Sequence, residues 1–302
     1  MAVYDTIIIG AGPAGLSAAI YAARQKINFV VLTGDIGGQT VWSTEVENYL
    51  GVHLVTGDQL VQKFEEHLKD YKIDVRQQEP AKSVKKKAKV FEVKTEKGVY
   101  QAKTLIIASG KQPRHLNVPG EKELYGKGVT YCATCDAPLY KDKIVAIVGG
   151  GNSAIEAAMI LDKYAKKMYI ITRDDKIRGE PVLLDKINKI KKLNHIKNAN
   201  TKEIKGNKFV TELVYDQDGK EKSIKTEGVF VEIGLIPNTK FIDIVKKNDK
   251  GEIITDKEMQ TDVPGIFAAG DVNDGEEKQI IVAAGEGCVA LLNAVRYLQK
   301  LK

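Results

Sequence analysis

The stretch Tyr4-Asp-Thr-Ile-Ile-Ile-Gly10-Ala-Gly-Pro-Ala-Gly15 decides the fold. Residues 4–9 have the length of a buried strand, and the Ala-rich residues 14–24 predict a helix. Between them stands the pattern GxGxxG. Its first glycine permits a tight turn, its second lets a phosphate approach the backbone, and its third allows close packing of helix on strand. With a further strand over 27–32, the stretch predicts the start of a dinucleotide-binding domain whose helix N-terminus faces the phosphates.

A second copy of this pattern begins at residue 143. Residues 143–148, 154–166 and 168–171 predict a strand, a helix and a strand, with the turn Gly149-Gly150-Gly151-Asn152-Ser153-Ala154 between the first two. Each copy is followed by hairpin-like strands, at 90–93, 99–102 and 104–108 and again at 209–215, 222–226 and 228–233. A last strand over 265–269 and a long helix over 279–298 end the chain. We therefore predict an α/β fold of two Rossmann-like, doubly wound nucleotide-binding domains, the second inserted into the first, with Pro113 and Pro237 near the crossings.

Composition excludes several classes of protein. The chain has 302 residues with 46 Lys and Arg against 40 Asp and Glu, so its net charge of +6 is small for its length. The Lys cluster at 85–89 is typical of a solvated turn or edge rather than of a nucleic-acid surface. No apolar run approaches the roughly 18 residues of a membrane span. Three cysteines and the lack of an apolar signal stretch before Tyr4 predict a cytoplasmic location.

The ends of the second strands bear on nucleotide recognition. An acidic residue usually stands there and holds a ribose hydroxyl. The first copy has Leu32-Thr33-Gly34 instead, so the hydroxyl of Thr33 or backbone groups are expected to replace the acid. The second copy continues Thr172-Arg173-Asp174-Asp175-Lys176-Ile177-Arg178. Arg173 and Arg178 favour the 2′-phosphate of NADPH, whereas the two aspartates leave room for NADH, and surface ion pairs are the alternative role of both arginines.

The segment Cys132-Ala-Thr-Cys135-Asp136 carries a CxxC pair just before the second copy. A close pair in a reducing compartment is typical of redox chemistry or of a metal site. At a helix N-terminus the pKa of a thiol falls, so that one thiolate can attack the disulfide of a partner. Asp136 could pass a proton to the leaving thiolate.

A zinc site is the alternative for the CxxC pair, and it would need two more ligands. The remaining candidates form no second CxxC or HxxxH pair: Cys288, His53, His67, His115 and His195. Redox chemistry is therefore favoured, and no metal is expected. Cys288, in the apolar last helix, is expected to be a buried small side chain rather than a third redox thiol.

These motifs together resemble the low-molecular-weight thioredoxin reductase family. The chain is also similar to the C-terminal flavoprotein part of the alkyl hydroperoxide reductase flavoprotein subunit. The resemblance covers essentially the whole chain and rests on residues 10–15, 37–39, 44–49, 108–110, 132–136, 149–156, 234–238, 267–272, 278–280 and 285–287.

The resemblance implies an FAD-binding domain over 1–112 and 239–302 and an NAD(P)H-binding domain over 113–238 that carries the dithiol. It implies FAD and NADPH as cofactors, with NADH possible, a homodimer, and a small protein disulfide as substrate, from thioredoxin or a thioredoxin- or glutaredoxin-like protein. In the family, hydride passes from nicotinamide to flavin, and electrons then pass to the Cys132–Cys135 disulfide and on to the partner.

Site residues follow from the matching motifs. Cys135 would face the flavin, Cys132 would attack the partner, and Asp136 would donate the proton. Residues assigned to FAD, beside Thr33, are Gly10, Gly12, Pro13, Ala14, Gly15, Gly38, Gln39, Asn48, Ala108, Gly110, Gly270, Asp271, Gln279 and Ile280. Residues assigned to the pyridine nucleotide are Gly149, Gly151, Asn152, Ser153, Ala154, Glu156, Arg173 and Arg178.

The chain also departs from the family pattern. NADPH-dependent members typically carry His-Arg-Arg where this chain has Thr172-Arg173-Asp174, and Pro138-Leu139 replaces an aromatic pair after the dithiol. We predict an NADPH-dependent thioredoxin-disulfide reductase. The alternatives are an NADH-dependent donor to a peroxiredoxin system, a ferredoxin-dependent flavin thioredoxin reductase and a flavin redox sensor without turnover.

Overall fold

The computed structural model describes residues 3–43 and 46–301, and the chain divides into two compact units. Unit 1 comprises Met1–Gln112 and Ile236–Lys302, and unit 2 is Pro113–Leu235, inserted between these segments. The chain leaves unit 1 through β7 (Lys111–Pro113) and returns through β16 (Leu235–Pro237), and these two strands pair. Thr44 and Glu45, the first residues of the motif at 44–49, lie outside the described residues.

Unit 1 is built on a seven-stranded sheet with the order β3–β2–β1–β6–β5–β4, in which β17 also pairs with β6. β1 is parallel to β2 and to β6, as a doubly wound fold requires. β4 and β5 form an antiparallel extension, and the outer, Lys-rich β4 is the expected solvated edge. The strands are β1 (Val3–Ala11), β2 (Phe29–Ile36), β3 (Val75–Arg76), β4 (Ser83–Lys87), β5 (Val90–Lys94), β6 (Val99–Ile107) and β17 (Ile266–Ala268).

The strands predicted over 99–102 and 104–108 are one strand, β6. Its first half pairs with β5 and its second half with β17, while β1 runs along both halves. The exposed Lys103 between the two ranges broke the prediction, although the chain stays in the strand and the next residue, Thr104, is fully buried, with its hydroxyl 2.7 Å from that of Thr6. A satisfied hydroxyl can continue a buried strand.

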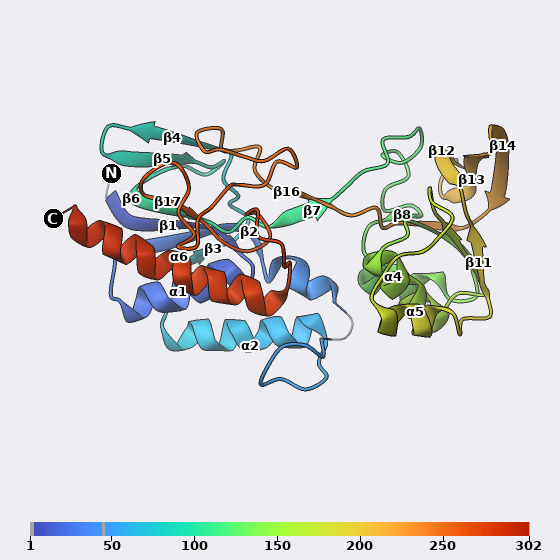
Figure 1. The fold of residues 1–302 in the computed structure, drawn as a ribbon, viewed down its shortest axis with the longest axis horizontal. Helices are drawn as coiled ribbons and strands as arrows, with labels where there is room; N and C mark the ends of the chain where they lie inside the picture. Colours follow the sequence, from blue (N-terminus) through green and yellow to red (C-terminus); the bar gives the residue numbers. More distant parts are fainter. Residues whose placement is uncertain (1–2, 44–45, 302) are drawn as a thin grey trace. The chain divides into compact units, whose positions relative to one another are not determined.

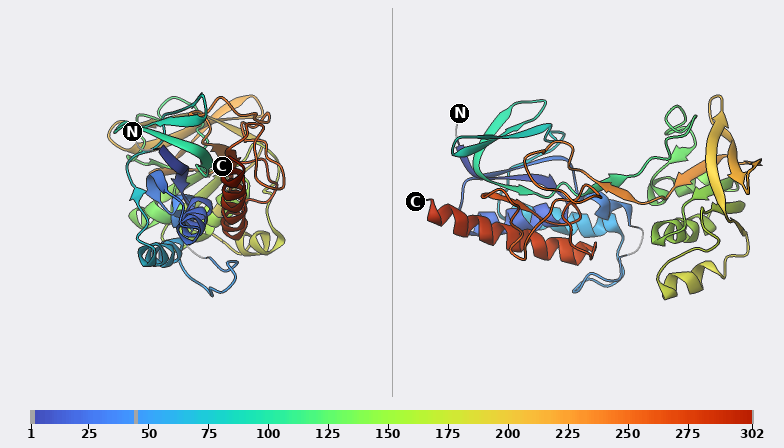
Figure 2. Two further views of the ribbon diagram at one scale, coloured as in Figure 1. Left: turned by 90° about the vertical axis from the view of Figure 1, so that its left-hand side faces the viewer. Right: turned by 45° about the horizontal axis from the view of Figure 1, so that its top comes forward.

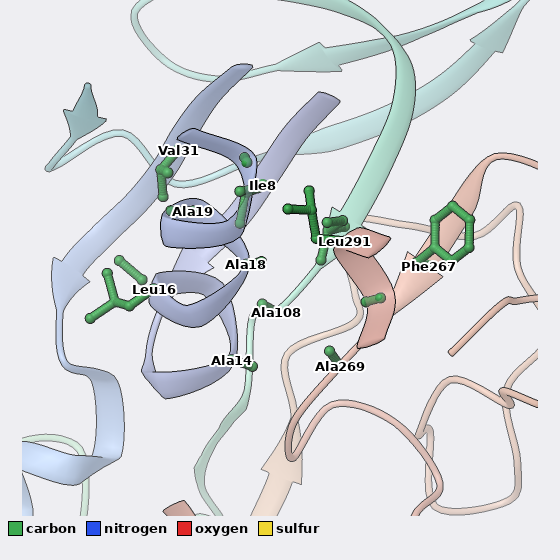
Figure 3. Packing of buried hydrophobic residues seen from close by; sticks show 14 of the residues in the cluster. Ile8, Ala14, Leu16, Ala18, Ala19, Val31, Ala108, Phe267, Ala269 and Leu291 are labelled. Atoms are coloured by element: carbon green, nitrogen blue, oxygen red, sulfur yellow. The ribbon is translucent and has the colours of Figure 1, made fainter. Parts of the chain in front are cut away.

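Three helices cover one face of this sheet, while the β4–β5 hairpin and the loops before β17 lie on the other side (Figure 1). They are α1 (Pro13–Arg24), α2 (Gly57–Asp70) and α6 (Ile280–Lys300); a short 3-10 helix, η1 (Gly38–Trp42), precedes α2. α1 and α6 lie side by side, and Figure 3 shows Ala14, Ala18 and Leu291 packed with residues of the sheet. A Cβ at Gly287 of α6 would lie 1.9 Å from the carbonyl oxygen of Ala14, so this glycine permits the close approach of the two helices.

α6 is also the one helix in the described part of the chain that is long and apolar enough to cross a membrane. Its Ala290, Leu291 and Ala294 are fully buried in the core of unit 1, as in a core helix. Cys288 of this helix is half-buried, whereas the sequence predicted a buried side chain. Its thiol is hydrogen-bonded to Tyr21.

Unit 2 contains a five-stranded parallel sheet with the order β11–β10–β9–β15–β8. Helix α4 packs on one face and a three-stranded antiparallel sheet on the other (Figure 2). The parallel strands are β8 (Val129–Thr130), β9 (Ile144–Val148), β10 (Lys167–Ile171), β11 (Leu193–Ile196) and β15 (Gly228–Val231). The antiparallel strands are β12 (Ala199–Gly206), β13 (Val210–Gln217) and β14 (Lys220–Lys225), and the helices are α3 (Ala133–Asp136), η2 (Ala137–Tyr140), α4 (Asn152–Asp162) and α5 (Pro181–Ile187).

Both units thus place helices on one face of a parallel sheet and antiparallel strands on the other, which confirms the predicted α/β class with two Rossmann-like units. β12 was not predicted, because exposed polar residues interrupt the alternation of buried and exposed positions along it. It also extended α4 to Lys166, whereas the helix ends at Asp162.

Candidate active site

The glycine turn of unit 1 has the geometry of a dinucleotide cradle. Gly10 has φ +107°, and a Cβ there would lie 2.2 Å from the carbonyl oxygen of Ala108. A Cβ at Gly15 would lie 1.9 Å from the carbonyl oxygen of Gly10, so neither position accepts a larger residue. Gly12, the N-cap of α1, faces open space and supplies no side-chain acceptor to the first N–H groups of the helix. Those N–H groups can therefore bind an anion.

Other residues assigned to FAD gather around this turn. Gly38 lies beside Gly12, since a Cβ on Gly38 would be 3.5 Å from the Cα of Gly12. Gln39 donates from Nε2 to Oδ2 of Asp271 at 3.5 Å, and Asn48 donates from Nδ2 to Oε1 of Gln279 at 3.1 Å. The fold thus brings together groups that are up to 232 positions apart in the chain.

Backbone contacts place the remaining predicted FAD residues. Ala108 donates its N–H to Ile9 at the end of β1, and a Cβ at Gly110 would lie 3.8 Å from Nε2 of Gln39. Gly270 donates its N–H to the carboxylate of Glu286 at 2.7 Å, and a Cβ there would lie 3.0 Å from that of Ala14. Pro13 and Ile280 are the first residues of α1 and α6.

The hydroxyl of Thr33 is engaged by the protein itself. It donates to the carbonyl oxygen of Asp35 at 2.5 Å and accepts the N–H of Ala11 at 3.2 Å. A hydroxyl has one hydrogen to donate. Thr33 therefore shapes the turn at the end of β2, and its role toward a ribose stays a prediction.

A buried ionic network at this site escaped the sequence analysis. Glu252 accepts from Nζ of Lys111 at 2.8 Å and from Nδ2 of Asn248 at 2.7 Å, and Nζ of Lys278 lies 3.9 Å away. Burial raises the pKa of Glu252, but these hydrogen bonds outweigh burial, so that its pKa lies below the usual value. Burial raises the pKa of Asp271 more than Lys278 and Lys111 lower it. The network fixes the segment between β17 and α6 beside the cradle.

The glycine turn of unit 2 repeats the cradle. Gly149 has φ +142°, and a Cβ there would lie 1.9 Å from the carbonyl oxygen of Glu232. Gly151, the N-cap of α4, faces open space like Gly12, and Ala154 is buried against the sheet. The two turns therefore share one geometry, with a free N–H cluster at a helix N-terminus.

Polar side chains of α4 hold the surroundings of this turn. Asn152 exchanges two hydrogen bonds with Glu180, at 3.0 and 3.2 Å. Ser153 is hydrogen-bonded to the carboxyl group of Glu232. Burial, followed by the charge of Glu156, raises the pKa of Glu232 to about 8, so this group holds a proton at neutral pH.

The strand end after β10 carries charges of both signs. Thr172 donates to the carbonyl oxygen of Asp174 at 2.7 Å and contacts Nε2 of His195 at 2.7 Å. The carboxylate of Asp174 forms an ion pair with Arg178 at 2.9 Å, and the N–H of Arg178 donates to Gly150 of the glycine turn. Arg173 is exposed. One of the two arginines predicted to bind a 2′-phosphate is therefore paired with an aspartate.

Cys132 and Cys135 form a disulfide across the first turn of α3, with their Cα atoms 5.4 Å apart. Thr130 fixes both ends of this segment. Its hydroxyl donates to the carboxylate of Asp136 at 2.5 Å and accepts the N–H of Cys132 at 3.1 Å. Thr130 thus holds Asp136 close to the dithiol, and the role of Asp136 as a proton donor stays a prediction.

A second carboxylate, that of Glu121, also holds this segment in place through hydrogen bonds. This residue was not predicted. It is 4% exposed and accepts the N–H groups of Leu116 and Asn117, at 2.7 and 2.6 Å, and the hydroxyl of Tyr131 at 2.9 Å. The sequence separates these partners by up to ten residues without a repeating pattern, so no local signal pointed to them.

A fold of two dinucleotide cradles, one in a unit that carries a disulfide in a CxxC turn, defines a pyridine-nucleotide-dependent disulfide oxidoreductase. The comparisons agree. Residues 4–287 match the family model described as "Pyridine nucleotide-disulphide oxidoreductase", and the chain belongs to this family. Enzymes of this family use FAD and a reduced pyridine nucleotide, NADH or NADPH.

Two curated relatives are each 42% identical to the chain and match 98% of it: a Bacillus subtilis protein named NADH dehydrogenase and a Pseudomonas aeruginosa protein named as an alkyl hydroperoxide reductase subunit. The chain spans only 58% of the length of each of them. Among solved structures, Lactococcus lactis thioredoxin reductase has a TM-score of 0.93 at 34% identity, with 98% of this chain and 99% of that chain covered. T. acidophilum thioredoxin reductase has a TM-score of 0.90 at 40% identity, with 99% of both chains covered. The resemblance to low-molecular-weight thioredoxin reductases is confirmed.

Proposed function

We propose that this chain is a flavin-dependent reductase of a small protein disulfide of the thioredoxin type. The observation that carries the proposal is the Cys132–Cys135 disulfide in a unit that also holds a pyridine-nucleotide cradle. The likeness to thioredoxin reductase structures over nearly their whole length supports thioredoxin as the partner. The homodimer and the cytoplasmic location stay predictions from the resemblance and the composition.

The cradle of unit 1 fits FAD, since Gly12 leaves room for a pyrophosphate at the N-terminus of α1 while Gly10 and Gly15 allow the close packing behind it. FAD held there would supply the redox chemistry that links a two-electron nicotinamide donor to the disulfide. We assign Gln39, Asn48, Asp271 and Gln279 to its polar contacts, because their side chains pair across the same cradle.

The exchange with the partner is carried by the chain's own thiols. After reduction, the thiolate of Cys132 attacks one sulfur of the partner disulfide, and a mixed disulfide forms while the other partner sulfur leaves as a thiolate. Asp136, held near the dithiol by Thr130, supplies the proton to that leaving thiolate. The thiolate of Cys135 then attacks Cys132, which re-forms the internal disulfide and releases the partner as a dithiol. Two electrons pass to the partner in each cycle.

NADPH, predicted from Arg173 and Arg178, stays a prediction, and the ion pair between Asp174 and Arg178 supports NADH instead. A carboxylate at this place repels a 2′-phosphate and can accept a hydrogen bond from a ribose hydroxyl. A second function, electron donation to a peroxiredoxin system with NADH, is favoured by the 42% identity to the Pseudomonas aeruginosa relative named for alkyl hydroperoxide reductase.

The test is anaerobic stopped-flow reduction of the FAD-loaded protein by equal concentrations of NADH and NADPH, followed by addition of oxidised thioredoxin. The proposal expects bleaching of the flavin by one nucleotide and its rapid reoxidation by thioredoxin. Reoxidation only by a peroxiredoxin system would favour the second function. A flavin that neither nucleotide bleaches would refute both and point to ferredoxin or to a redox sensor.

A further inference from the structure

Three rings cluster on the segment that leads into the dithiol. The ring of Tyr131 lies 4.9 Å from that of His115, edge to face at 83°, and 5.6 Å from that of Tyr125. Tyr125 is 63% exposed, and the side chain of His115 is 56% exposed. We call His115, Tyr125 and Tyr131 the aromatic patch.

Hydrogen bonds to the buried Glu121 hold this patch in place. Because a carboxylate only accepts, the hydroxyl of Tyr131 donates to Glu121 at 2.9 Å. The contact of 2.6 Å between Tyr131 Oη and His115 Nδ1 then requires the imidazole to donate from Nδ1, and in the neutral ring this tautomer has Nε2 as an acceptor. Burial, followed by Glu121, raises the pKa of Tyr131, so its phenol stays protonated at all pH values near neutrality.

Such a patch has the properties of a recognition surface. Tyrosine and histidine combine apolar area with a polar group and have few rotatable bonds, so little conformational entropy is lost when a partner covers them. Here the rings are already ordered by one another and by Glu121. The ring of Tyr125 contacts that of Tyr131 and is 63% exposed, so most of its area is open to a partner.

The position of the patch in the chain identifies its partner. Tyr131 is bonded directly to Cys132, the thiol assigned to exchange with the substrate disulfide. A protein whose disulfide reaches the sulfur of Cys132 must cover the surface next to it.

We propose that the aromatic patch is the docking surface for the protein substrate, a small thioredoxin-type protein with a CxxC disulfide. This inference rests on the proposed function. The apolar rim around the CxxC turn of the partner would pack on the rings of Tyr125 and Tyr131, and a backbone N–H or a hydroxyl of the partner would donate to Nε2 of His115.

The experiment compares Tyr125→Ala with Tyr125→Phe in the FAD-loaded, full-length protein, with a bacterial thioredoxin as the probe. Tyr125→Ala removes the ring, whereas Tyr125→Phe keeps it and is the matched control. We expect the KM for thioredoxin to rise about tenfold in Tyr125→Ala and to stay within about twofold in Tyr125→Phe, with kcat little changed in both. Two controls do not depend on docking of a protein. Reduction of the small disulfide DTNB reports on the dithiol, and bleaching of the flavin by the nucleotide reports on the cofactors.

Each outcome decides the matter. An unchanged KM for thioredoxin in Tyr125→Ala overturns the docking surface and leaves the proposed function intact. A parallel loss of DTNB reduction would also overturn it, because the ring would then act on the dithiol itself. Altered sedimentation of Tyr125→Ala would assign the patch to contact with a second copy of the chain. A wild-type protein that does not reduce thioredoxin, although it reduces DTNB, refutes the proposed function and the docking surface together.

Discussion

Replacement of Asp174 by arginine should shift the nucleotide preference toward NADPH. In the protein the carboxylate of Asp174 lies 2.9 Å from the guanidinium of Arg178, and both side chains are largely exposed. The pair itself contributes at most about 1 kcal/mol to stability, since exposed ion pairs are weak. The effect of this ion pair on a bound 2′-phosphate is larger. The guanidinium of Arg178 is already engaged by a carboxylate and attracts the phosphate less, and the carboxylate of Asp174 repels the phosphate.

The magnitude follows from the charges. A phosphate monoester carries about −1.5 to −2 charges at pH 7. Two anions held by one guanidinium lie about 6 Å apart, which gives a repulsion of about 1 to 2 kcal/mol where mostly water intervenes. Arginine at position 174 replaces this repulsion by an attraction of similar size, and salt at physiological strength screens part of both. A net change of about 2 kcal/mol corresponds to about thirtyfold in the ratio of kcat/KM for NADPH over NADH.

The assay is anaerobic reduction of the flavin over a range of concentrations of each nucleotide. Asp175→Arg is the matched control, because it makes the same change in net charge one position away from the ion pair. We expect Asp174→Arg to shift the ratio toward NADPH and Asp175→Arg to shift it by less than a third as much on a logarithmic scale. Equal shifts in both variants would refute a specific role of the Asp174–Arg178 pair. A wild-type preference for NADPH of tenfold or more would refute the electrostatic reasoning itself.

Three further predictions test the site. Cys135→Ser should keep its yellow FAD spectrum and lose thioredoxin reduction, because no second thiol can release the mixed disulfide; unimpaired turnover would sink the proposed function. Gly15→Ala should lose FAD and at least about 3 kcal/mol of stability in denaturant unfolding, since its Cβ would lie 1.9 Å from the oxygen of Gly10. The control Gly12→Ala, which meets open space, should lose FAD affinity and still fold, and equal stability of the two variants would contradict this. Glu232→Gln should flatten the pH dependence of stability. The folded protein holds a proton on Glu232 up to about pH 8, which the unfolded chain releases near its ordinary pKa of 4.5. Wild-type stability should therefore fall as pH rises between these values, by at most about 1.4 kcal/mol per pH unit. An identical slope in both proteins would disprove the assignment.

The glycine turns could be predicted from the sequence because the spacing of their glycines is local, although the oxygens that Gly10 and Gly149 approach belong to the distant Ala108 and Glu232. Gly10 and Gly149 both have positive φ. A Cβ at either position would lie within 2.2 Å of a backbone oxygen, so no other residue fits there. The CxxC turn is local for the same reason, since three positions of helical backbone bring Cys132 and Cys135 together. Patterns that depend on a few neighbouring positions are visible without knowledge of the fold.

The carboxylate networks could not be predicted in this way. Lys111 meets Glu252 across 141 positions, and neither residue belongs to a motif that would mark it as buried. Glu121 is equally inconspicuous in the sequence, and only the fold shows that Tyr131 reaches it. In both cases the partner, and not the residue, makes burial of the charge tolerable.

The two strand ends show what a threonine does at the place where an acid usually stands. Thr33 and Thr172 stand at equivalent places, and each donates its hydroxyl hydrogen to the carbonyl oxygen two residues further on. Thr33 also accepts the N–H of Ala11, and Thr172 contacts His195, so each threonine ties its turn to a neighbouring strand. The usual acid would bind a ribose at this place, whereas a threonine with its only hydrogen engaged stabilises the turn instead. We therefore expect the pyridine nucleotide to be recognised by the next charged residues along the chain, and a substitution at Asp174, rather than at Thr172, to change which nucleotide is preferred.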